Sequence, residues 1–179
     1  MGRTYVFRHI VGNVDFNRPW QEYEDGFGHV VGDHWLGLRH MRDITLNDRL
    51  YRLMFILTVP SGVRYYTEYK DFIIGGSADG YPFSMNSNVV PKKAHDCLSA
   101  LVGAPFSTYD NDSDGSALIN CAQRHGAGWW YKGDSCSSVC SPLSLLSSAT
   151  NLWSGNFAYA FWSTVNGTVS LSEVVAFLF

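Results

Sequence analysis

The chain is short of charged residues and of long apolar runs. Lys, Arg, Asp and Glu make up 16% of its 179 residues, below the roughly 25% usual in globular domains, and the formal net charge is -3. This balance gives no support for the basic patch that nucleic acid or an anionic membrane surface would require. No stretch approaches the roughly 20 apolar residues of a membrane-spanning helix. Nucleic-acid binding and membrane insertion are therefore not expected.

Signatures of catalysis are lacking as well. The segment GGSAD (75–79) lacks the closing glycine of the serine-hydrolase turn, and no glycine-rich phosphate-binding loop is present. His125, Asp112 and Asp114 could form an acid–base group. The stronger interpretation is that His125 is an ordinary loop histidine and that the two carboxylates bind a cation. The sequence therefore predicts a protein that is not an enzyme.

The opening residues, MGRTYVFRHIVG, contain no apolar core of signal-peptide length. The four cysteines all lie in the second half of the chain: Cys97, Cys121, Cys136 and Cys140. None forms a C-x-x-C pair, so a zinc site is not expected, whereas an even number in a loop-rich region favours two disulfides and an oxidising compartment. Asn166 begins an Asn-Gly-Thr sequon for glycosylation. We expect an extracellular, secreted protein of which this chain is a fragment or an excised domain.

What the chain does have is an aromatic content of 15% and enough length for one domain with a sizeable core. Apolar alternation and turn residues favour an α+β fold around a mostly antiparallel sheet. The Tyr-rich hairpin formed by 50–59 and 64–74 is expected at the centre of that sheet. The other expected elements are a strand at 4–10, a helix between an Asn17 N-cap and Gly26, a helix at 37–46, a turn-rich segment at 75–88, one or two helical turns at 94–102, and strands at 157–165 and 168–179.

The most informative segment is FSTYDNDSDGSALINCAQRHGAGWWY (106–131). Asp110, Asp112 and Asp114 alternate on a Gly- and Ser-containing loop, a pattern that suits a hard cation with oxygen ligands, above all Ca²⁺. An EF-hand is excluded, because its twelfth position requires a bidentate Glu and Cys121 stands there. An acidic surface turn remains the alternative, since Asp, Ser and Gly are also ordinary turn formers.

Six blocks of the sequence occur in the order and spacing of a known family. They are VDFNRPWQEYEDGFG (14–28), HWLGL (34–38), FSTYDNDSD (106–114), NCA (120–122), GWWY (128–131) and WST (162–164). Over essentially its whole length the chain resembles the fibrinogen C-terminal domain, without the N-terminal subdomain of that family. The resemblance implies a central antiparallel sheet subdomain, about 1–93 and 160–179, and a loop-rich calcium and ligand subdomain, about 94–159. It also implies that oligomerisation would depend on segments upstream of the domain.

The resemblance places the calcium carboxylates on Asp112 and Asp114. Backbone carbonyls near Ser116 and Leu118 would complete the coordination with water, and Asp110 would brace the loop. The chain departs from the family here, because it has one more residue than usual before the NCA block and Ile119 where the family has glycine. This departure affects the expected carbonyl ligands, whereas the two carboxylate ligands are retained.

The family disulfide falls on Cys121–Cys136. Cys97 and Cys140 stand where the family usually has other residues, and their joint presence suggests a second bridge, Cys97–Cys140. Two buried thiols are the alternative.

The implied ligand-binding residues are His125, Tyr131, Cys136 and Ser137. Family lectins that recognise acetyl groups use a Cys-His pair where this chain has Cys136-Ser137, and the fibrin-type pocket uses an acidic residue where it has His125. Two functions follow from the resemblance. The first is a calcium-dependent, lectin-like module that binds acetylated or other glycans in innate defence. The alternative is an extracellular protein-binding module of matrix or receptor-ligand type.

Overall fold

The computed structural model describes residues 2–47, 49–92, 94–134, 136, 140–146, 159–164 and 167–179, with the side chains of 87–92 outside the description. Ten strands are described in these ranges: β1 (Thr4–His9), β2 (Phe27–Gly28), β3 (His34–Trp35), β4 (Leu53–Thr58), β5 (Arg64–Ile74), β6 (Phe83–Lys92), β7 (Cys140–Ser141), β8 (Phe161–Thr164), β9 (Gly167–Ser170) and β10 (Glu173–Leu178). The helices in them are α1 (Trp20–Asp25), α2 (Leu38–Thr45) and α3 (Cys121–His125), with 3-10 turns η1 (Ser77–Asp79) and η2 (Ser99–Leu101).

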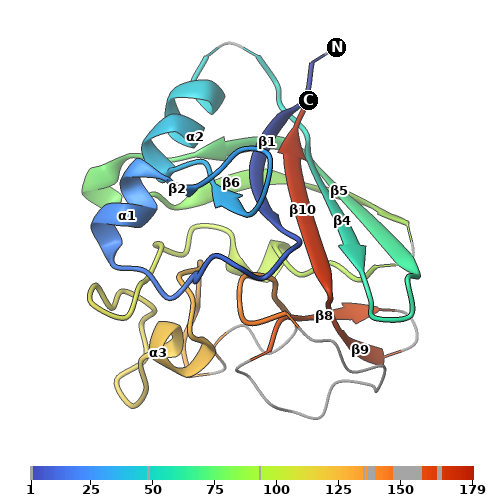
Figure 1. Ribbon diagram of the computed structural model, residues 1–179. Helices are drawn as coiled ribbons and strands as arrows, with labels where there is room; N and C mark the ends of the chain where they lie inside the picture. The colour runs from blue at the N-terminus through green and yellow to red at the C-terminus, as the bar shows by residue number, and fades with distance from the viewer. Residues whose placement is uncertain are drawn as a thin grey trace.

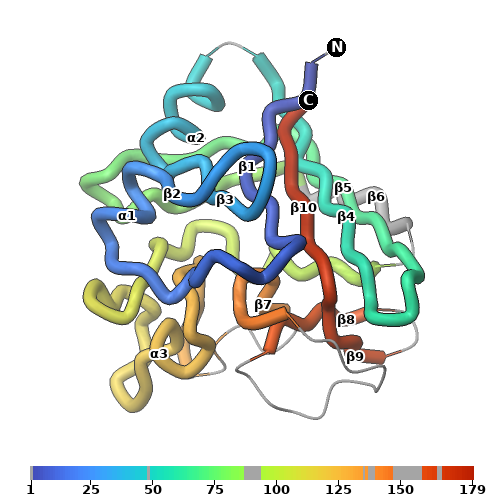
Figure 2. Tube along the Cα trace, in the orientation of Figure 1, coloured from blue at the N-terminus to red at the C-terminus, as the bar shows by residue number. Residues whose placement is uncertain are grey.

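Seven strands form one antiparallel sheet in the order β2-β3-β1-β10-β4-β5-β6. The last strand of the chain, β10, lies at its centre and pairs with both β1 and β4. Because Thr4 pairs with Leu178, the two ends of the chain lie side by side, as Figures 1 and 2 show. The central position of β10 corrects the expectation that the 50–74 hairpin occupies the middle of the sheet. That hairpin itself is confirmed as β4 and β5.

A second, three-stranded sheet has the order β7-β8-β9 and lies beyond the end of β10 in Figure 1. It contains 161–164 and 167–170, which the sequence assigns to the same subdomain as the central sheet. After β6, the chain returns to the central sheet at Glu173, where β10 begins. The region 75–92 differs from expectation too, because the turn at η1 is followed by the long strand β6.

The two expected N-terminal helices are confirmed, but α1 begins later than predicted. Its N-cap position is held by Pro19, and Asn17 instead donates its backbone N–H to the Asp15 carboxylate at 2.8 Å. Proline is well suited to a helix start because its φ is preset and it has no N–H to satisfy. Gly26 ends the helix at φ 96°, where a β-carbon would lie 2.6 Å from the Leu36 carbonyl oxygen.

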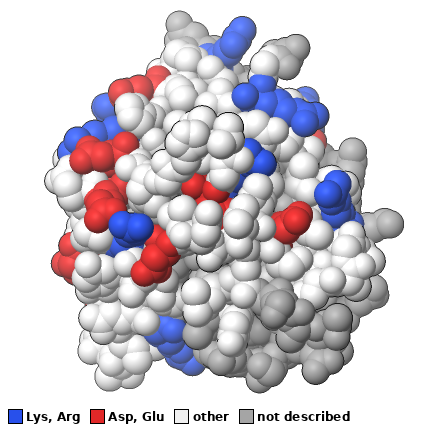
Figure 3. Space-filling view, in the orientation of Figure 1, with Lys and Arg blue, Asp and Glu red and all other residues white. Residues whose placement is uncertain are grey.

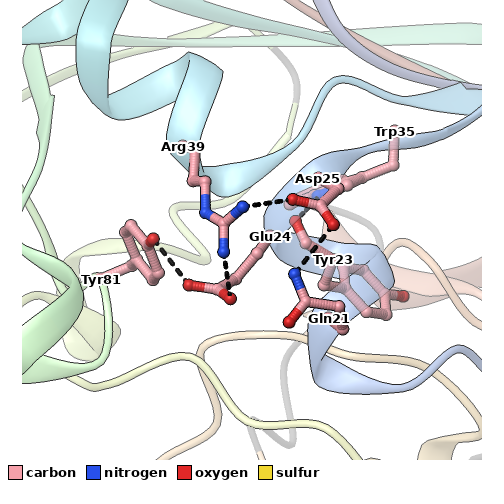
Figure 4. A network of polar contacts seen from close by, with 7 residues as sticks. All are labelled: Gln21, Tyr23, Glu24, Asp25, Trp35, Arg39 and Tyr81. Atoms are coloured by element: carbon pink, nitrogen blue, oxygen red, sulfur yellow. Dashed lines mark hydrogen bonds and ion pairs between the residues drawn. The ribbon is translucent and has the colours of Figure 1, made fainter.

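A network of charges joins α1, α2 and the start of the loop before β6 (Figure 4). Arg39 on α2 contacts Glu24 at 3.0 Å and Asp25 at 2.5 Å, both on α1. The Tyr81 hydroxyl donates to the second oxygen of Glu24 at 2.8 Å. Glu24 is nearly buried, so this pairing supplies the partners that a desolvated carboxylate needs. The network fixes how the helices pack beside the sheet.

One carboxylate organises the loop that follows β1. Asp33 accepts backbone N–H groups from Ile10, Val11, Gly12 and Asn13 at 2.7, 2.8, 2.7 and 3.1 Å. Burial acts to raise the pKa of Asp33, but the donated hydrogen bonds and the nearby His9 outweigh it and hold this pKa below its usual range. The loop 10–13 is therefore tied firmly to the residue before β3.

His9, at the end of β1, gives the domain a stability that depends on pH. Burial lowers the pKa of His9 from 6.5 to about 4, although Asp33 and a hydrogen bond to the Pro142 carbonyl oppose this. The unfolded chain thus binds a proton near pH 6.5 and the folded chain only near pH 4, so stability is lost as the pH falls through this window. The loss from His9 is about 3 kcal/mol. His34, whose pKa burial also lowers, acts in the same direction.

We expect the pH dependence between 6.5 and 4 to flatten when His9 is replaced by Gln. Urea denaturation at half-unit pH steps measures it, with exposed His40→Gln as the matched control that keeps the slope of the parent protein. Equal slopes for the His9 variant and the parent would contradict the assignment. Below about pH 4 a separate loss is expected in both proteins, because the folded state keeps Asp33 ionised to lower pH than the unfolded state does.

Candidate functional site

The acidic loop is attached to the aromatic core by short pairings. Ser107 pairs with Trp129, and a tight turn joins Thr108 to Asn111. Asp110 accepts the Thr108 hydroxyl at 2.7 Å and the Trp20 backbone N–H at 2.9 Å. Asp110 thus braces the loop against the start of α1, which is the role expected for it.

Asp112 and Asp114 lie together on the next residues of this loop. Asp114 is buried, and its two carboxylate oxygens accept the N–H groups of Ser116 at 2.7 Å and Cys121 at 2.8 Å. Asp112 is exposed to solvent. Desolvation raises the pKa of Asp112, and the nearby charge of Asp114 acts in the same direction against the hydrogen bond from the Asp114 N–H. Two like charges are therefore held close, and a cation between them would relieve their repulsion.

A turn built on Ser116 follows the two carboxylates. Its hydroxyl accepts the N–H groups of Leu118 and Ile119 at 3.2 and 3.1 Å and donates to Asp134 at 2.5 Å. The Leu118 side chain is 80% exposed, so it does not anchor the turn by packing. The Ser116 turn thus brings Asp134 to the margin of the loop.

This donor set fits a calcium ion with backbone and water ligands. Each Asp114 oxygen accepts one N–H and keeps a further lone pair, since a carboxylate offers about four acceptor positions. Within the described ranges, no group of three or more His, Cys, Asp and Glu side chains could hold a metal. The remaining ligands of an ion at Asp112 and Asp114 would therefore be carbonyl oxygens and water, which Ca²⁺ accepts readily.

The Cys121–Cys136 disulfide is present, as the resemblance implied. Cys121 is the first residue of α3, a five-residue helix that the sequence pattern does not predict. Asn120 caps it by accepting the Gln123 N–H at 2.9 Å, and Gly126 ends it in the left-handed conformation. An N-cap residue and a C-terminal glycine were visible in the sequence, but a single turn has no periodicity to reveal it.

The residues expected to bind a ligand lie in the interior. His125 is 1% exposed, and Tyr131 and Cys136 are fully buried. The His125 ring stacks on Tyr131 with centroids 5.0 Å apart, and its Nε2 lies 2.8 Å from the Cys136 carbonyl oxygen. These three side chains therefore pack in the core and do not face solvent in this structure. Ser137, the fourth predicted ligand residue, and Asn166, the predicted glycosylation site, lie outside the described residues.

The Gly-Trp-Trp-Tyr run packs into the core so closely that Gly128 has no room for a side chain. A β-carbon there would lie 2.7 Å from Tyr23 Cε2 and 2.8 Å from Phe106 Cε1. We expect Gly128→Ala to lower the free energy of unfolding by about 1–3 kcal/mol or more, because neither buried ring can withdraw. Gly32→Ala, where the nearest atom is 3.9 Å away, is the control. Equal midpoints of urea denaturation for the two variants would contradict this packing.

The expected Cys97–Cys140 bridge is not formed, which corrects that prediction. Both residues are buried thiols, and Cys140 Sγ lies 3.7 Å from the Cys97 carbonyl oxygen. Burial, and then the neighbouring Cys140, raises the pKa of the Cys97 thiol well above its usual range. A thiol kept protonated in the core reacts slowly, since the thiolate is the reactive form.

The surface drawn in Figure 3 consists mostly of uncharged residues, and acidic and basic groups alternate along the margin where α1 and α2 lie. Exposed apolar side chains include Val11, Val30, Val31 and Leu145. None of the helices in the described part of the sequence is long and apolar enough to cross a membrane.

Comparisons with known proteins agree with this architecture. The family model for the fibrinogen beta and gamma chains, C-terminal globular domain, matches residues 1–174. The chain is 34% identical over 130 residues to angiopoietin-related protein 1 of Mus musculus, covering 73% of this chain and 26% of the relative. It is 35% identical over 130 residues to protein scabrous of Drosophila melanogaster, covering 73% and 16%. The chain thus spans about a quarter or less of the length of these curated relatives.

Among solved structures, the fibrinogen-like globe domain of human ANGPTL2 superposes with a TM-score of 0.88 at 28% identity. That match covers 99% of this chain and 80% of the solved one.

Proposed function

The chain belongs to the family formed by the C-terminal globular domains of the fibrinogen beta and gamma chains, and from that membership we propose that it is an extracellular recognition module whose partner is another protein. The observation that carries this choice is the burial of His125, Tyr131 and Cys136, whose side chains would otherwise form a glycan pocket. The similarity to angiopoietin-related protein 1 and protein scabrous supports the same choice. The disulfide supports an extracellular location, because such bonds persist in oxidising compartments. The module acts by binding and carries out no catalysis.

The partner class is testable on cells of the organism that encodes the protein. We expect labelled, disulfide-bonded protein to bind these cells, to lose binding after brief protease treatment, and to keep it after enzymatic deglycosylation. Protein that has been reduced and alkylated is the control for nonspecific adhesion. Loss of binding on deglycosylation, or retention on N-acetylated resin with elution by free acetate, would overturn the proposal in favour of a lectin.

Calcium is the second part of the proposal. Asp112 and Asp114 bind one Ca²⁺, with carbonyl oxygens near Ser116 and Leu118 and water completing its coordination. The support is the pair of neighbouring carboxylates and the lone pairs that Asp114 retains after accepting two N–H groups. A bound ion would hold the acidic loop in one conformation and so prepare the adjoining surface for its partner.

Asp112→Asn is expected to weaken calcium binding at least roughly tenfold, about 1.4 kcal/mol, because one ligand charge is removed. Asp112 is exposed and accepts the Asp114 N–H at a long 3.5 Å, a contact that the asparagine oxygen can keep, so folding without calcium should change little. Titration calorimetry and thermal unfolding with and without a chelator measure both quantities. Asp43→Asn, at an exposed residue of α2, is the charge-matched control. Parent protein whose melting temperature ignores calcium would contradict the site.

A further inference from the structure

The central sheet has one face against the aromatic core and a second face on the opposite side. Strand pairing arranges the residues of this second face in rows across β1, β10, β4 and β5, because directly opposed residues share a face of a sheet. Two neighbouring rows are Arg8, Val175, Ile56, Tyr66 and Tyr5, Phe177, Met54, Glu68. We call the surface formed by these two rows the outer sheet face.

The outer sheet face is partly open to solvent. Leu57 and Val174, which point to the core, are fully buried, whereas Tyr5 and Tyr66 on the outer sheet face are 39% and 37% exposed. Ile56, which lies between them on β4, is half-buried. Tyrosine, methionine and arginine are enriched in the interfaces between proteins, so the composition of this face fits a contact with a protein.

Two arginines are held over the aromatic rings of this face. The Arg3 guanidinium lies 4.7 Å from the centre of the Phe177 ring, and that of Arg8 lies 5.4 Å from the centre of the Tyr5 ring. Arg8 uses one N–H for the Val30 carbonyl at 3.2 Å. A planar guanidinium that stacks on a ring keeps N–H groups at its edge, where they can donate in pairs to a carboxylate.

Three arginines at the outer sheet face have no acidic partner. They are Arg3, Arg8 and the exposed Arg64 at the start of β5. In the ranges that the structure describes, none of the three forms an ion pair with a carboxylate. Their positive charge is therefore available to a partner.

The acidic residues of the same face leave this excess of positive charge in place. Glu68 is nearly buried and is already paired with Arg52 at 2.8 Å. Glu173, at the start of β10, adds one carboxylate against the three arginines. The outer sheet face is thus basic, although the formal net charge of the whole chain is -3. Interfaces between proteins tend to be complementary in charge, so this face selects an acidic partner surface.

We propose that the outer sheet face binds an acidic segment of the partner protein, in which carboxylates are interspersed with apolar or aromatic side chains. Arg3, Arg8 and Arg64 donate to the carboxylates, and the apolar side chains pack on Ile56 and Val175. This contact is separate from the surface beside the acidic loop. The inference rests on the proposed function, because it names the chemistry by which a protein partner is held.

Two random copolymers, poly(Glu,Tyr) and poly(Lys,Tyr), separate the effect of charge from that of the aromatic side chains. In methyl-labelled protein, we expect poly(Glu,Tyr) to shift the NMR resonances of Met54, Ile56 and Val175 and to bind at least roughly tenfold more tightly than poly(Lys,Tyr). Added salt should weaken this binding, because it screens exposed charges. Equal affinity for the two copolymers would overturn the proposal. Shifts with heparin but none with poly(Glu,Tyr) would assign the face to a sulfated glycan instead, and shifts that depend only on protein concentration would assign it to a second copy of the chain.

Variants at exposed positions test the same point from the side of the protein. Arg64→Glu should weaken poly(Glu,Tyr) binding roughly tenfold or more, because it places like charges opposite each other. Glu173→Gln should strengthen binding, and Tyr66→Thr, which keeps a residue suited to a strand, should weaken it. Arg124→Glu, at an exposed residue of α3 away from β4 and β5 in Figure 1, is the charge-matched control and should bind as the parent does. Unchanged affinity in the Arg64→Glu variant would contradict the proposal.

The cell-binding assay separates failure of this inference from failure of the proposed function. If the Arg64→Glu and Tyr66→Thr variants bind cells as well as the parent does, the partner does not use the outer sheet face and this inference is wrong, while the protein-binding function stands. If deglycosylation abolishes the parent's binding, the proposed function fails first and this inference fails with it. Loss of cell binding in these two variants, with the Arg124→Glu variant unaffected, supports both.

Discussion

Trp35→Ala should lower the free energy of unfolding by about 3–5 kcal/mol, enough to leave much of the domain unfolded at physiological temperature. Trp35 is 1% exposed and contacts rings from three regions: Phe7 on β1, Tyr23 on α1, and Phe106 and Trp130 beside the acidic loop. Its indole N–H also donates to the Tyr23 carbonyl at 2.9 Å, so truncation leaves a buried acceptor unsatisfied as well as a cavity.

Urea denaturation followed by circular dichroism measures this effect. Trp35→Phe is the matched variant, because it keeps an aromatic ring and removes the N–H, and it should cost clearly less than the alanine variant. Trp20→Ala, at a partly exposed tryptophan on α1, is the second control and should also cost less. A Trp35→Ala protein as stable as the Trp20→Ala protein would show that Trp35 does not join the sheet to the acidic loop.

Replacing both Cys121 and Cys136 by serine is expected to cost about 3 kcal/mol, because the disulfide closes a loop of 15 residues and restricts the unfolded state. The bond also joins the start of α3 to Cys136, close to Gly133 and Asp134. These two residues hold the acidic loop, because Gly133 donates its N–H to the Asp114 carbonyl and Asp134 accepts the Ser116 hydroxyl. Calcium affinity should therefore fall in the double variant even at temperatures where it stays folded.

The matched control replaces the other two cysteines, Cys97 and Cys140, by alanine in a second double variant. Because these thiols form no disulfide, this variant loses no restraint on the unfolded state and should cost less than the Cys121/Cys136 variant. Alkylation without reducing agent, followed by mass spectrometry, should modify Cys97 and Cys140 only after denaturation. A parent protein that resists alkylation at all four cysteines when denatured would instead demonstrate the second bridge.

Much of the fold could be predicted because it depends on local patterns. Alternation in RYYTEYKDFII predicts β5 as Arg64–Ile74, and the Pro-Ser-Gly turn before it predicts the hairpin with β4. Helix α2 follows from apolar residues at helical spacing. Strand β6 was missed, because the glycines, serines and asparagines around it indicate turns and its pairing with β5 is a long-range contact.

The candidate site likewise has some features that local sequence patterns predict and others that only packing decides. Alternate carboxylates within five residues predict an acidic loop on their own, and the resemblance to a family assigned the disulfide. The exposure of His125 and Tyr131 could not be predicted, because a histidine beside a Trp-Trp-Tyr run is compatible with either a pocket or a core. Packing decided it, by stacking the two rings away from solvent.

The sequence by itself therefore determined the local elements, the acidic loop and the family, since these depend on residue types at short spacing. Only the tertiary structure decided that β10 fills the centre of the sheet and that Cys97 and Cys140 remain thiols. Each of these depends on contacts between segments that are distant in the sequence. Such contacts are selected by the burial of apolar surface as a whole, and they leave no short-range pattern in the sequence.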